Sequence, residues 1–408
     1  MVDHRKLGRE LELFASDPLA GAGLPIWLPH GAAARHAVEE HVREMERRHG
    51  YQHVVSPPMG RPELFRLSRH LEHFADEMFP AMRMSDHDSA DELILRPGLC
   101  PMHSLVYRSR GRSYRELPLR IAELGPMFRS ERSGVLGGLS RVRVIELNDG
   151  HTFCSEQQAV DEVCRELELI QRAHADLGVQ ASSFRLSLRD DSDKYIDDEE
   201  MWEKSEAVLR AALARADVSY ADGPGEAAFY GPKIDIQVRD DAGREQTLST
   251  VQIDYDKPER FDLEYVAADG SRQRPVMIHR SLVGSMERLF AHLIEVHAGA
   301  FPAWYAPVQL EILPIAAAQE DAAWELHRAA IDAGLRVSVS AEGSLGARIR
   351  ESALRKVPYS AVIGAREAAA GEVSLRLRDG RELPPRPAAA ALEMIGKVVR
   401  SRSFDLLE

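Results

Sequence analysis

The sequence has few cysteines, no long apolar run and no excess of positive charge. Its three cysteines, Cys100, Cys154 and Cys164, are too sparse for a disulfide framework and favour reduced thiols or metal ligation. No segment approaches the ~18 apolar residues of a membrane span, and the charged N-terminus lacks the apolar core of a signal peptide. The net charge of −13 argues against an overall basic nucleic-acid protein. We therefore expect a soluble cytoplasmic protein with no membrane or DNA partner, although a local basic patch could still bind RNA.

What the sequence does have is apolar material for more than one core. Of its 408 residues 44% are hydrophobic, enough for two or three domains. The segment 298–308 carries two prolines between periodic regions and predicts a boundary, with one domain over 1–304 and another over 305–408. Beyond the boundary, expected strands near 308–313, 335–339, 360–364 and 373–377 alternate with helices, which predicts a small α/β domain of βαβ character.

The first part of the chain is organised around the stretch 115–154. Apolar-rich runs at 119–128 and 142–147 flank a polar, glycine-rich segment at 130–140, which predicts a long hairpin loop between antiparallel strands. Arg129 and Arg141 stand at the two feet of this loop. A guanidinium stays charged and presents a planar fork of donors suited to phosphate, although two solvated arginines on a hairpin would give the same pattern.

Two later segments add polar groups. In the expected strand 229–238, Lys233 and two further polar residues alternate with apolar ones, and the companion strand 248–255 places Gln252 similarly. Such a face is either a ligand floor or the solvated side of an ordinary sheet. In 275–304 a strand and a turn at Gly284–Ser285 precede a helix with Arg288 in its first turn. The helix macrodipole disfavours a cation there unless an anion is near, so Arg288 favours phosphate binding.

The order of these motifs resembles a known family. SYRELPLRIAE, FRSERSG, LSRVRV and DGHTFC are similar to motif 2 of the class II aminoacyl-tRNA synthetases, and specifically to the threonyl-tRNA synthetases. The similarity continues over almost the whole chain. It implies an α+β catalytic domain on an antiparallel sheet, followed by an α/β anticodon-binding domain. It also implies a homodimer whose interface includes the helix and strand at 36–58. The implied reaction is activation of threonine with ATP and transfer to the 3′ end of tRNA(Thr), with one Zn2+ per subunit and Mg2+ with ATP.

The resemblance also implies roles for individual residues. The expected catalytic residues are Arg129, Lys233 and Arg288. The expected ATP-binding residues are Arg129, Glu131, Arg141, Gln252, Ser285 and Arg288. The amino acid is expected to contact Gly98, Leu147, Asp149, Tyr230 and Lys233. The expected zinc ligands are Cys100, His151 and His279. The expected tRNA contacts are His70, Glu367, Arg376, Arg348 and Arg350, the last two because four cations gather between 348 and 356.

The sequence departs from the family mainly at the amino-acid pocket. Gly98-Leu99 stands where the family has Met-Asn, and Leu147, Gly137 and Thr247 replace glutamine, histidine and glutamine. Each lost side-chain hydrogen bond costs ~0.5–1.5 kcal/mol. Two alternatives therefore stay open: a paralogue that activates a threonine-like amino acid, serves another acceptor or tolerates an inhibitor, and a non-catalytic tRNA sensor. From the resemblance we expect no counterpart of the family's editing domain in this chain, and we therefore also expect it to charge serine without correction.

Overall fold

The computed structural model describes residues 2–83, 92–240 and 242–407. The chain forms two compact units, each assembled from separate stretches. The large unit comprises Pro18–Leu24 and His41–His292, and the C-terminal unit comprises Met1–Asp17, Pro25–Glu40 and Leu293–Glu408. The boundary predicted after residue 304 falls inside the C-terminal unit.

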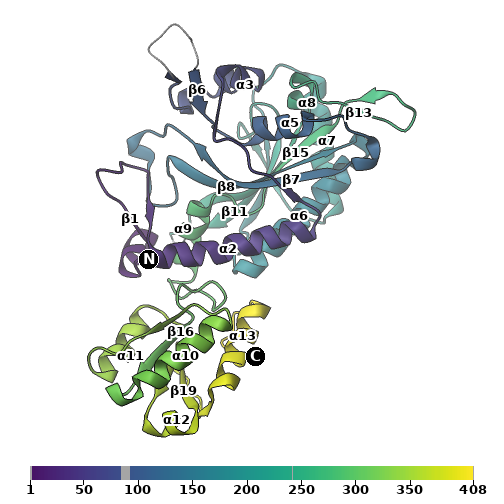
Figure 1. The fold of residues 1–408 in the computed structure, drawn as a ribbon. Helices are drawn as coiled ribbons and strands as arrows, with labels where there is room; N and C mark the ends of the chain where they lie inside the picture. Colours follow the sequence, from purple (N-terminus) through teal and green to yellow (C-terminus); the bar gives the residue numbers. More distant parts are fainter. Residues whose placement is uncertain (1, 84–91, 241, 408) are drawn as a thin grey trace. The chain divides into compact units, whose positions relative to one another are not determined.

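The large unit is built on a mainly antiparallel eight-stranded sheet (Figure 1), ordered β10-β9-β11-β12-β15-β8-β7-β3. The outermost pairs, β10 with β9 and β3 with β7, are parallel, and the other pairs are antiparallel. The strands are β3 Gln52–His53, β7 Leu119–Phe128, β8 Val144–Cys154, β9 Ser183–Leu188, β10 Ala221–Pro224, β11 Lys233–Arg239, β12 Glu245–Asp254 and β15 Val276–Ser281.

The predicted hairpin is the β7–β8 pair. Its register runs from Leu119 opposite Phe153 to Phe128 opposite Val144, so the polar segment between the strands is a loop as expected. Of the three glycines in that loop, Gly138 is the one with a positive φ, at 59°. β8 continues to Cys154, further than the run at 142–147 indicates.

The helices of the large unit follow their sequence signals with one notable exception. Ser155 and Gln158 form the expected capping box ahead of α6, and Gly178 ends that helix in the left-handed conformation. Cys100 is the first residue of helix α5, although the sequence of 92–103, ELILRPGLCPMH, predicts a strand that enters a loop. The strand expected at 51–58 is shorter than predicted and ends at His53. The helices are α3 Pro62–Leu67, α4 His70–His73, α5 Cys100–Arg108, α6 Ala159–Leu177, α7 Glu199–Arg215 and α8 Asp256–Arg260.

The C-terminal unit contains the predicted α/β fold. Its five-stranded sheet has the order β17-β16-β18-β19-β20, with β16 parallel to both β17 and β18 and with β19 antiparallel to its neighbours. A core that includes Leu310, Ile312, Tyr359 and Ile395 fills this unit. Its strands and helices are β16 Leu310–Pro314, β17 Val337–Val339, β18 Tyr359–Ile363, β19 Glu372–Leu377, β20 Arg386–Pro387, α10 Glu320–Asp332, α11 Leu345–Leu354, α12 Ala365–Ala370 and α13 Ala388–Ser401.

The other elements are α1, α2, α9 and seven short strands. Among the described residues, none of the helices combines the length and apolarity needed to cross a bilayer. The bounds are α1 His4–Glu10, β1 Phe14–Ala15, β2 Ile26–Trp27, α2 Pro29–Arg48, β4 Met59–Gly60, β5 Met82–Arg83, β6 Glu92–Leu95, β13 Tyr265–Val266, β14 Arg272–Gln273 and α9 Met286–Val296.

Candidate active site

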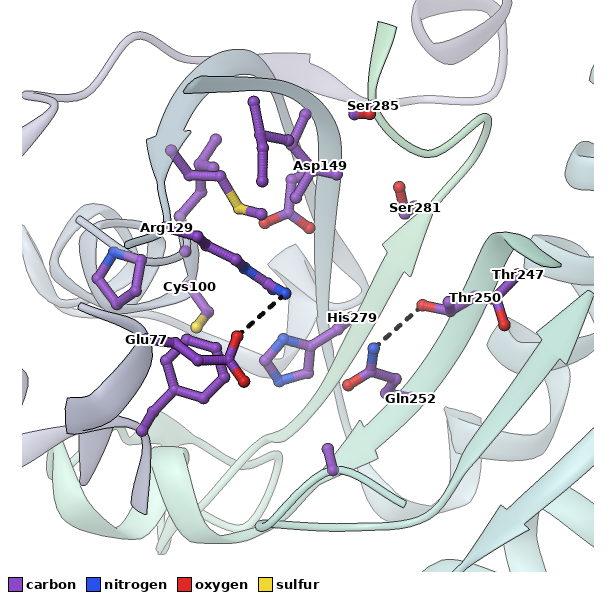
Figure 2. Close-up of a pocket in the computed structure, with 18 of the residues that line it drawn as sticks. Glu77, Cys100, Arg129, Asp149, Thr247, Thr250, Gln252, His279, Ser281 and Ser285 are labelled. Atoms are coloured by element: carbon purple, nitrogen blue, oxygen red, sulfur yellow. Dashed lines mark hydrogen bonds and ion pairs between the residues drawn. The ribbon is translucent and has the colours of Figure 1, made fainter. Parts of the chain in front are cut away.

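A cavity of about 820 Å³ lies in the large unit, lined by β8, β11, β12, β15, α4 and the loop after β7 (Figure 2). Residues far apart in the sequence meet there because the strands that carry them are neighbours in one sheet. His151 alone among the site residues expected in this unit does not line the cavity, because it is fully buried behind His279. The expected residues that line it are His70, Gly98, Cys100, Arg129, Glu131, Arg141, Leu147, Asp149, Tyr230, Lys233, Gln252, His279, Ser285 and Arg288.

The three expected metal ligands form one cluster. Cys100 begins α5, and the β8–β15 register sets His151 directly opposite His279. The donor atoms of the three side chains lie within 4.8 Å of one another, and all three residues are buried. One sulfur and two imidazole nitrogens are donors that suit Zn2+, and three protein ligands leave a fourth tetrahedral position for substrate or water.

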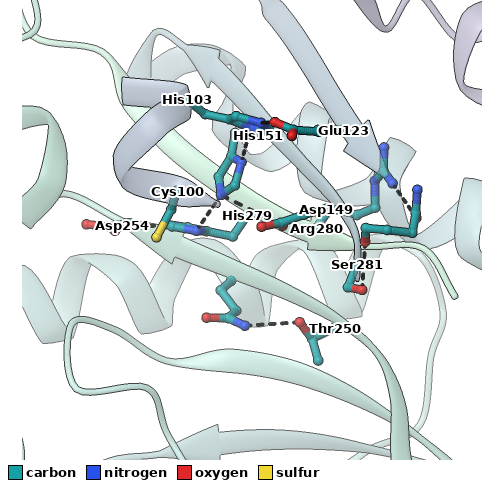
Figure 3. Close-up of polar contacts among 12 residues, drawn as sticks. Cys100, His103, Glu123, Asp149, His151, Thr250, Asp254, His279, Arg280 and Ser281 are labelled. Atoms are coloured by element: carbon teal, nitrogen blue, oxygen red, sulfur yellow. Dashed lines mark hydrogen bonds and ion pairs between the residues drawn. The ribbon is translucent and has the colours of Figure 1, made fainter. Parts of the chain in front are cut away.

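The hydrogen bonds around the two histidines assign their tautomers (Figure 3). His279 Nε2 lies 2.8 Å from Asp254 Oδ2, and His103 Nε2 lies 3.1 Å from Glu123 Oε2. A carboxylate can only accept, so both Nε2 atoms carry protons. His103 Nδ1, 2.7 Å from His151 Nδ1, then accepts the proton that His151 donates. The unprotonated atoms left over are His151 Nε2 and His279 Nδ1.

Those two nitrogens face each other at 2.9 Å. Two lone pairs at this distance repel unless a cation or a proton lies between them. Burial lowers the pKa of both imidazoles, His151 especially, which disfavours the proton. Burial also raises the pKa of the Cys100 thiol to about 12, so its thiolate needs a cation nearby. The donor set therefore fits a metal ion.

The sequence did not identify the residues that hold the ligands from outside. His103 follows Cys100 by three residues, a spacing that can ligate a metal, but His103 contacts His151 instead of joining the triad. Behind His103, the buried Glu123 pairs with the fully buried Arg96 at 3.0 Å. Contacts of this kind fix the orientation of a metal-binding imidazole. The residues that make these contacts lie on four different strands and one helix. Their spacing in the sequence therefore could not predict that they meet.

The cavity beside the triad carries the groups expected to contact an amino acid. Burial raises the pKa of Asp149 to about 7. The Tyr230 ring stacks on His279, with 5.0 Å between centroids, and its hydroxyl donates to Gln252 Oε1 at 2.5 Å. Lys233 Nζ donates to the buried Asp235. These polar groups face the cavity, so the alternating face of β11 and β12 is part of the pocket wall and not an ordinary solvated face.

Four arginines line the cavity, and three of them, all but Arg280, are expected to contact the nucleotide. Arg129 Nη1 lies 3.7 Å from Glu77 Oε2, and its guanidinium covers the Phe74 ring at 5.2 Å. Arg141 Nε lies 3.0 Å from Glu131 Oε2. Burial lowers the pKa of Arg129 and of Arg288, and Arg129 and Arg141 lower that of Arg288 further.

Arg288 is held by backbone carbonyls rather than by a carboxylate. Its Nη1 donates to the Thr247 carbonyl at 3.0 Å, and its Nε donates to the Ser140 carbonyl at 3.3 Å. Together with Arg129 and Arg141 it gathers positive charge at one end of the cavity, which suits an anion with several negative oxygens.

The departures at the pocket leave space beside the triad. A Cβ built on Gly98 would lie 3.9 Å from both Cys100 Sγ and His70 Nε2, which is ordinary contact. A methyl group at position 98 would therefore fit, and glycine leaves that space free. Leu147 places an apolar group in the same lining, and its backbone bridges to Ser285. Thr247 Oγ1 is engaged with Gln237 at 2.9 Å.

Two of the expected tRNA contacts are not surface residues. His70 is buried in the cavity wall, where its Nδ1 lies 2.8 Å from Ser68 Oγ, and burial lowers its pKa to about 3. Arg348 is buried as well, and its Nη1 donates to the carbonyls of Pro314 and Ser340 at 2.7 and 2.6 Å. Arg348 thus joins parts of the fold, and only 5% of its surface is exposed in this chain.

The other expected tRNA contacts lie nearer the surface of the C-terminal unit. Arg350 is exposed. Arg376 is half-buried and pairs with Glu382. Glu367 accepts hydrogen bonds from the Gly364 amide at 3.1 Å and from Ser374 Oγ at 3.0 Å, which ties down the start of α12.

Comparison with known proteins places this geometry in a family. Residues 83–297 match the tRNA synthetase class II core domain (G, H, P, S and T), and residues 309–397 match the anticodon binding domain. The threonine–tRNA ligase of Geobacillus sp. (strain WCH70) is 49% identical over 378 residues, which are 92% of this chain and 58% of that protein. That of Lactococcus lactis subsp. lactis (strain IL1403) is 46% identical over 405 residues, 98% of this chain and 62% of that protein.

Solved structures agree. The crystal structure of the RNA binding domain of threonyl-tRNA synthetase from Cryptosporidium parvum Iowa II has a TM-score of 0.92 and 32% identity, covering 99% of both chains. The prolyl-tRNA synthetase of Giardia lamblia, solved with prolyl-adenylate, shares the fold at a TM-score of 0.73 and 18% identity, covering 98% of this chain and 80% of that one. The chain spans about three fifths of the length of the curated relatives above. It belongs to the class II aminoacyl-tRNA synthetases and, within them, to the threonyl-tRNA synthetase family.

Proposed function

We propose that this chain activates L-threonine with ATP and transfers it through threonyl-adenylate to the 3′ end of tRNA(Thr). The observation that carries the proposal is that the Cys100–His151–His279 cluster and three arginines belong to one site, at the same cavity. An enzyme that joins a carboxylate to the α-phosphate of ATP needs an amino-acid site and a phosphate site side by side.

At the nucleotide end, this chain supplies positioning and charge. Arg129 would neutralise the α-phosphate and the attacking carboxylate, and Arg288 would bind towards the γ-phosphate, with Mg2+ sharing that charge. Each guanidinium exchanges a weak internal partner for a phosphate: Glu77 in the case of Arg129, backbone carbonyls in the case of Arg288. Glu131 would hold the adenine, with Arg141, Gln252 and Ser285 completing the nucleotide site.

At the amino-acid end, Cys100, His151 and His279 would hold Zn2+, which when bound supplies a Lewis acid for the amino and hydroxyl groups of threonine. Asp149 would contact the substrate hydroxyl, and Tyr230 the amino group. Lys233 would contribute to the same pocket. Valine lacks the hydroxyl, and a site that hydrogen-bonds a hydroxyl rejects the analogue without it strongly.

The remaining features of the proposal concern the whole enzyme. Residues 1–304 would form the catalytic domain and 305–408 the anticodon-binding domain, with Glu367, Arg376 and Arg350 towards tRNA. The match of 309–397 to the anticodon binding domain supports tRNA as the acceptor. A cytoplasmic homodimer is part of this proposal.

The test is amino-acid-dependent ATP–pyrophosphate exchange by the zinc-loaded chain, followed by charging of tRNA(Thr). Exchange with threonine and not with valine supports the proposal. Absence of exchange with every amino acid, while tRNA still binds, would instead identify a non-catalytic tRNA sensor.

A second candidate is supported by the space at Gly98. Room beside Cys100 would admit a β-hydroxy amino acid with a substituent larger than the methyl of threonine. Such a paralogue could serve another acceptor or tolerate an inhibitor of the usual pocket. Exchange that is faster with β-hydroxynorvaline or β-hydroxyleucine than with threonine would favour this candidate, and Gly98→Met should reverse that order.

A further inference from the structure

A lysine with no assigned role lies beside the metal-binding cluster. Lys257, in α8, has a fully buried side chain. Its Nζ donates to Asp254 Oδ2 at 2.9 Å and lies 3.3 Å from the centroid of the Tyr230 ring. A buried ammonium is costly unless it is paired, and here a carboxylate and an aromatic ring compensate it together.

The carboxylate that pairs with Lys257 is the one that holds His279. Asp254 Oδ2 lies 2.8 Å from His279 Nε2 (Figure 3). The same oxygen accepts from Lys257 Nζ, while Oδ1 accepts from the Lys257 amide at 2.8 Å. Asp254 itself is fully buried, at the end of β12. The lysine therefore fixes both oxygens of the group that sets the tautomer of His279.

Tyr230 contacts both His279 and Lys257. Its ring stacks on His279 with an interplanar angle of 29° and also lies against the Lys257 ammonium. One cation thus contacts the support of a metal ligand and the tyrosine that borders the amino-acid pocket.

We infer that Lys257 and Asp254 act as a positioning pair: they hold His279 with Nδ1 free for the metal, and they hold Tyr230 in register with it. The inference rests on the proposed zinc-dependent function, and it concerns how the ligand and the tyrosine are kept in place. In the competing explanation the pair only anchors α8, as a buried ion pair that contributes to folding.

The experiment compares the metal site of wild-type protein with two variants. Lys257→Met keeps the length and volume of the side chain but leaves Asp254 buried without its cation, which by itself can destabilise a fold. Asp254→Asn/Lys257→Met removes both charges and keeps an oxygen that can accept from His279. The matched control is Lys204→Met, because Lys204 also lies over a tyrosine ring, that of Tyr255 at 4.7 Å, but is exposed.

The readouts are zinc affinity in competition with a chromophoric chelator, the visible spectrum of the Co2+-substituted protein, and KM for threonine against kcat in pyrophosphate exchange. Loss of an outer support typically costs 10–100-fold in metal affinity. We expect such a loss and a changed cobalt spectrum in both variants, a KM for threonine raised more than kcat is lowered, and none of these effects in Lys204→Met.

A variant that folds, binds zinc as tightly as wild type and gives the wild-type cobalt spectrum would overturn the inference. The double variant keeps this outcome accessible if Lys257→Met alone is unfolded. Since the affinity and the spectrum do not depend on catalysis, they decide the positioning role even if wild type shows no exchange with threonine, a result that would reject the proposed function separately.

Discussion

Glu77 and Arg129 face each other at the cavity, with 3.7 Å between Glu77 Oε2 and Arg129 Nη1. Both side chains are partly exposed, at 46% and 35%, so the pair is worth about 1 kcal/mol at most. The Glu77 carboxylate pairs with the guanidinium that we assign to the α-phosphate. A bound nucleotide would therefore have to displace Glu77 from Arg129.

Glu77→Gln should therefore lower KM for ATP, by up to about fivefold, with kcat little changed. Steady-state pyrophosphate exchange at varied ATP measures this. Asp76→Asn, one residue away and also at the cavity, serves as the control because, among the described residues, the ion pair of Arg129 is with Glu77 and not with Asp76. An unchanged or raised KM in Glu77→Gln would show that the carboxylate does not compete with ATP.

Arg129→Ala should abolish adenylate formation while the protein stays folded. A single electrostatic contact at the reacting phosphate is worth on the order of 100-fold or more in rate. Pyrophosphate exchange gives the rate, and circular dichroism checks the fold. Arg132→Ala removes a nearby charge of the same loop that does not line the cavity and should keep wild-type activity. Near-wild-type exchange in Arg129→Ala would show that Arg129 has no role in adenylate formation and is only a surface charge.

Metal content should follow the triad. We expect close to one zinc per chain in purified protein, and its loss in Cys100→Ala/His279→Ala, because two of three donors are then gone. Elemental analysis provides the measurement. Cys164→Ala should keep its zinc, since Cys164 lies in α6 outside the cluster. Zinc retained by the double variant would place the metal elsewhere.

Serine should be activated together with threonine. A site that selects a β-hydroxyl distinguishes the two only through one methyl group, which gives roughly 10–200-fold at best. The space at Gly98 weakens contact with that methyl, so we expect discrimination near the lower end and an increase on Gly98→Met. The ratio of kcat/KM for the two amino acids in exchange tests this, with purified seryl-tRNA followed separately for hydrolysis. Undetectable serine activation would mean that residues other than Gly98 contact the methyl group of threonine closely enough to exclude serine.

Stability should depend on pH through His174. Its Nε2 lies 2.7 Å from Ser249 Oγ, and burial lowers its pKa from 6.5 to about 4, with His292 adding to the shift. Between these values the unfolded chain binds the proton and the folded chain does not, so stability is lost as pH falls from about 6.5 towards 4. The loss is at most about 3 kcal/mol. Urea titrations at several pH values should show a shallower loss in His174→Gln, and the wild-type slope in His36→Gln, where the histidine is exposed.

The sequence predicts elements whose periodicity is local. The apolar-rich runs on either side of the glycine-rich segment identify β7 and β8, and Ser155, Gln158 and Gly178 are the sequence signals for the start and end of α6. The segment 92–103 predicts a strand entering a loop, whereas Cys100 begins α5; Pro101 does not prevent this, because proline is tolerated in the first turn of a helix.

Side-chain direction was harder to predict from charge alone. Arg348 counts as one of four cations near 348–356, yet it shares the inward face of α11 with Ser352. The spacing of four residues between them was the available signal. Asp254 and Lys257 carry no such signal, because what they support is a histidine on another strand that only the β12–β15 register brings close.

The burial of His151 also decides how an ion reaches the site. Behind the triad, His103 and Glu123 are closed off from solvent, while Cys100 and His279 border the cavity. In the proposed function, the ion and the amino acid would therefore both enter through this cavity. A bound amino acid would block the path of the ion, so a chelator should remove zinc from the resting protein faster than from the same protein saturated with threonine and ATP. The protein would then lose its metal more slowly while substrates are bound than in their absence.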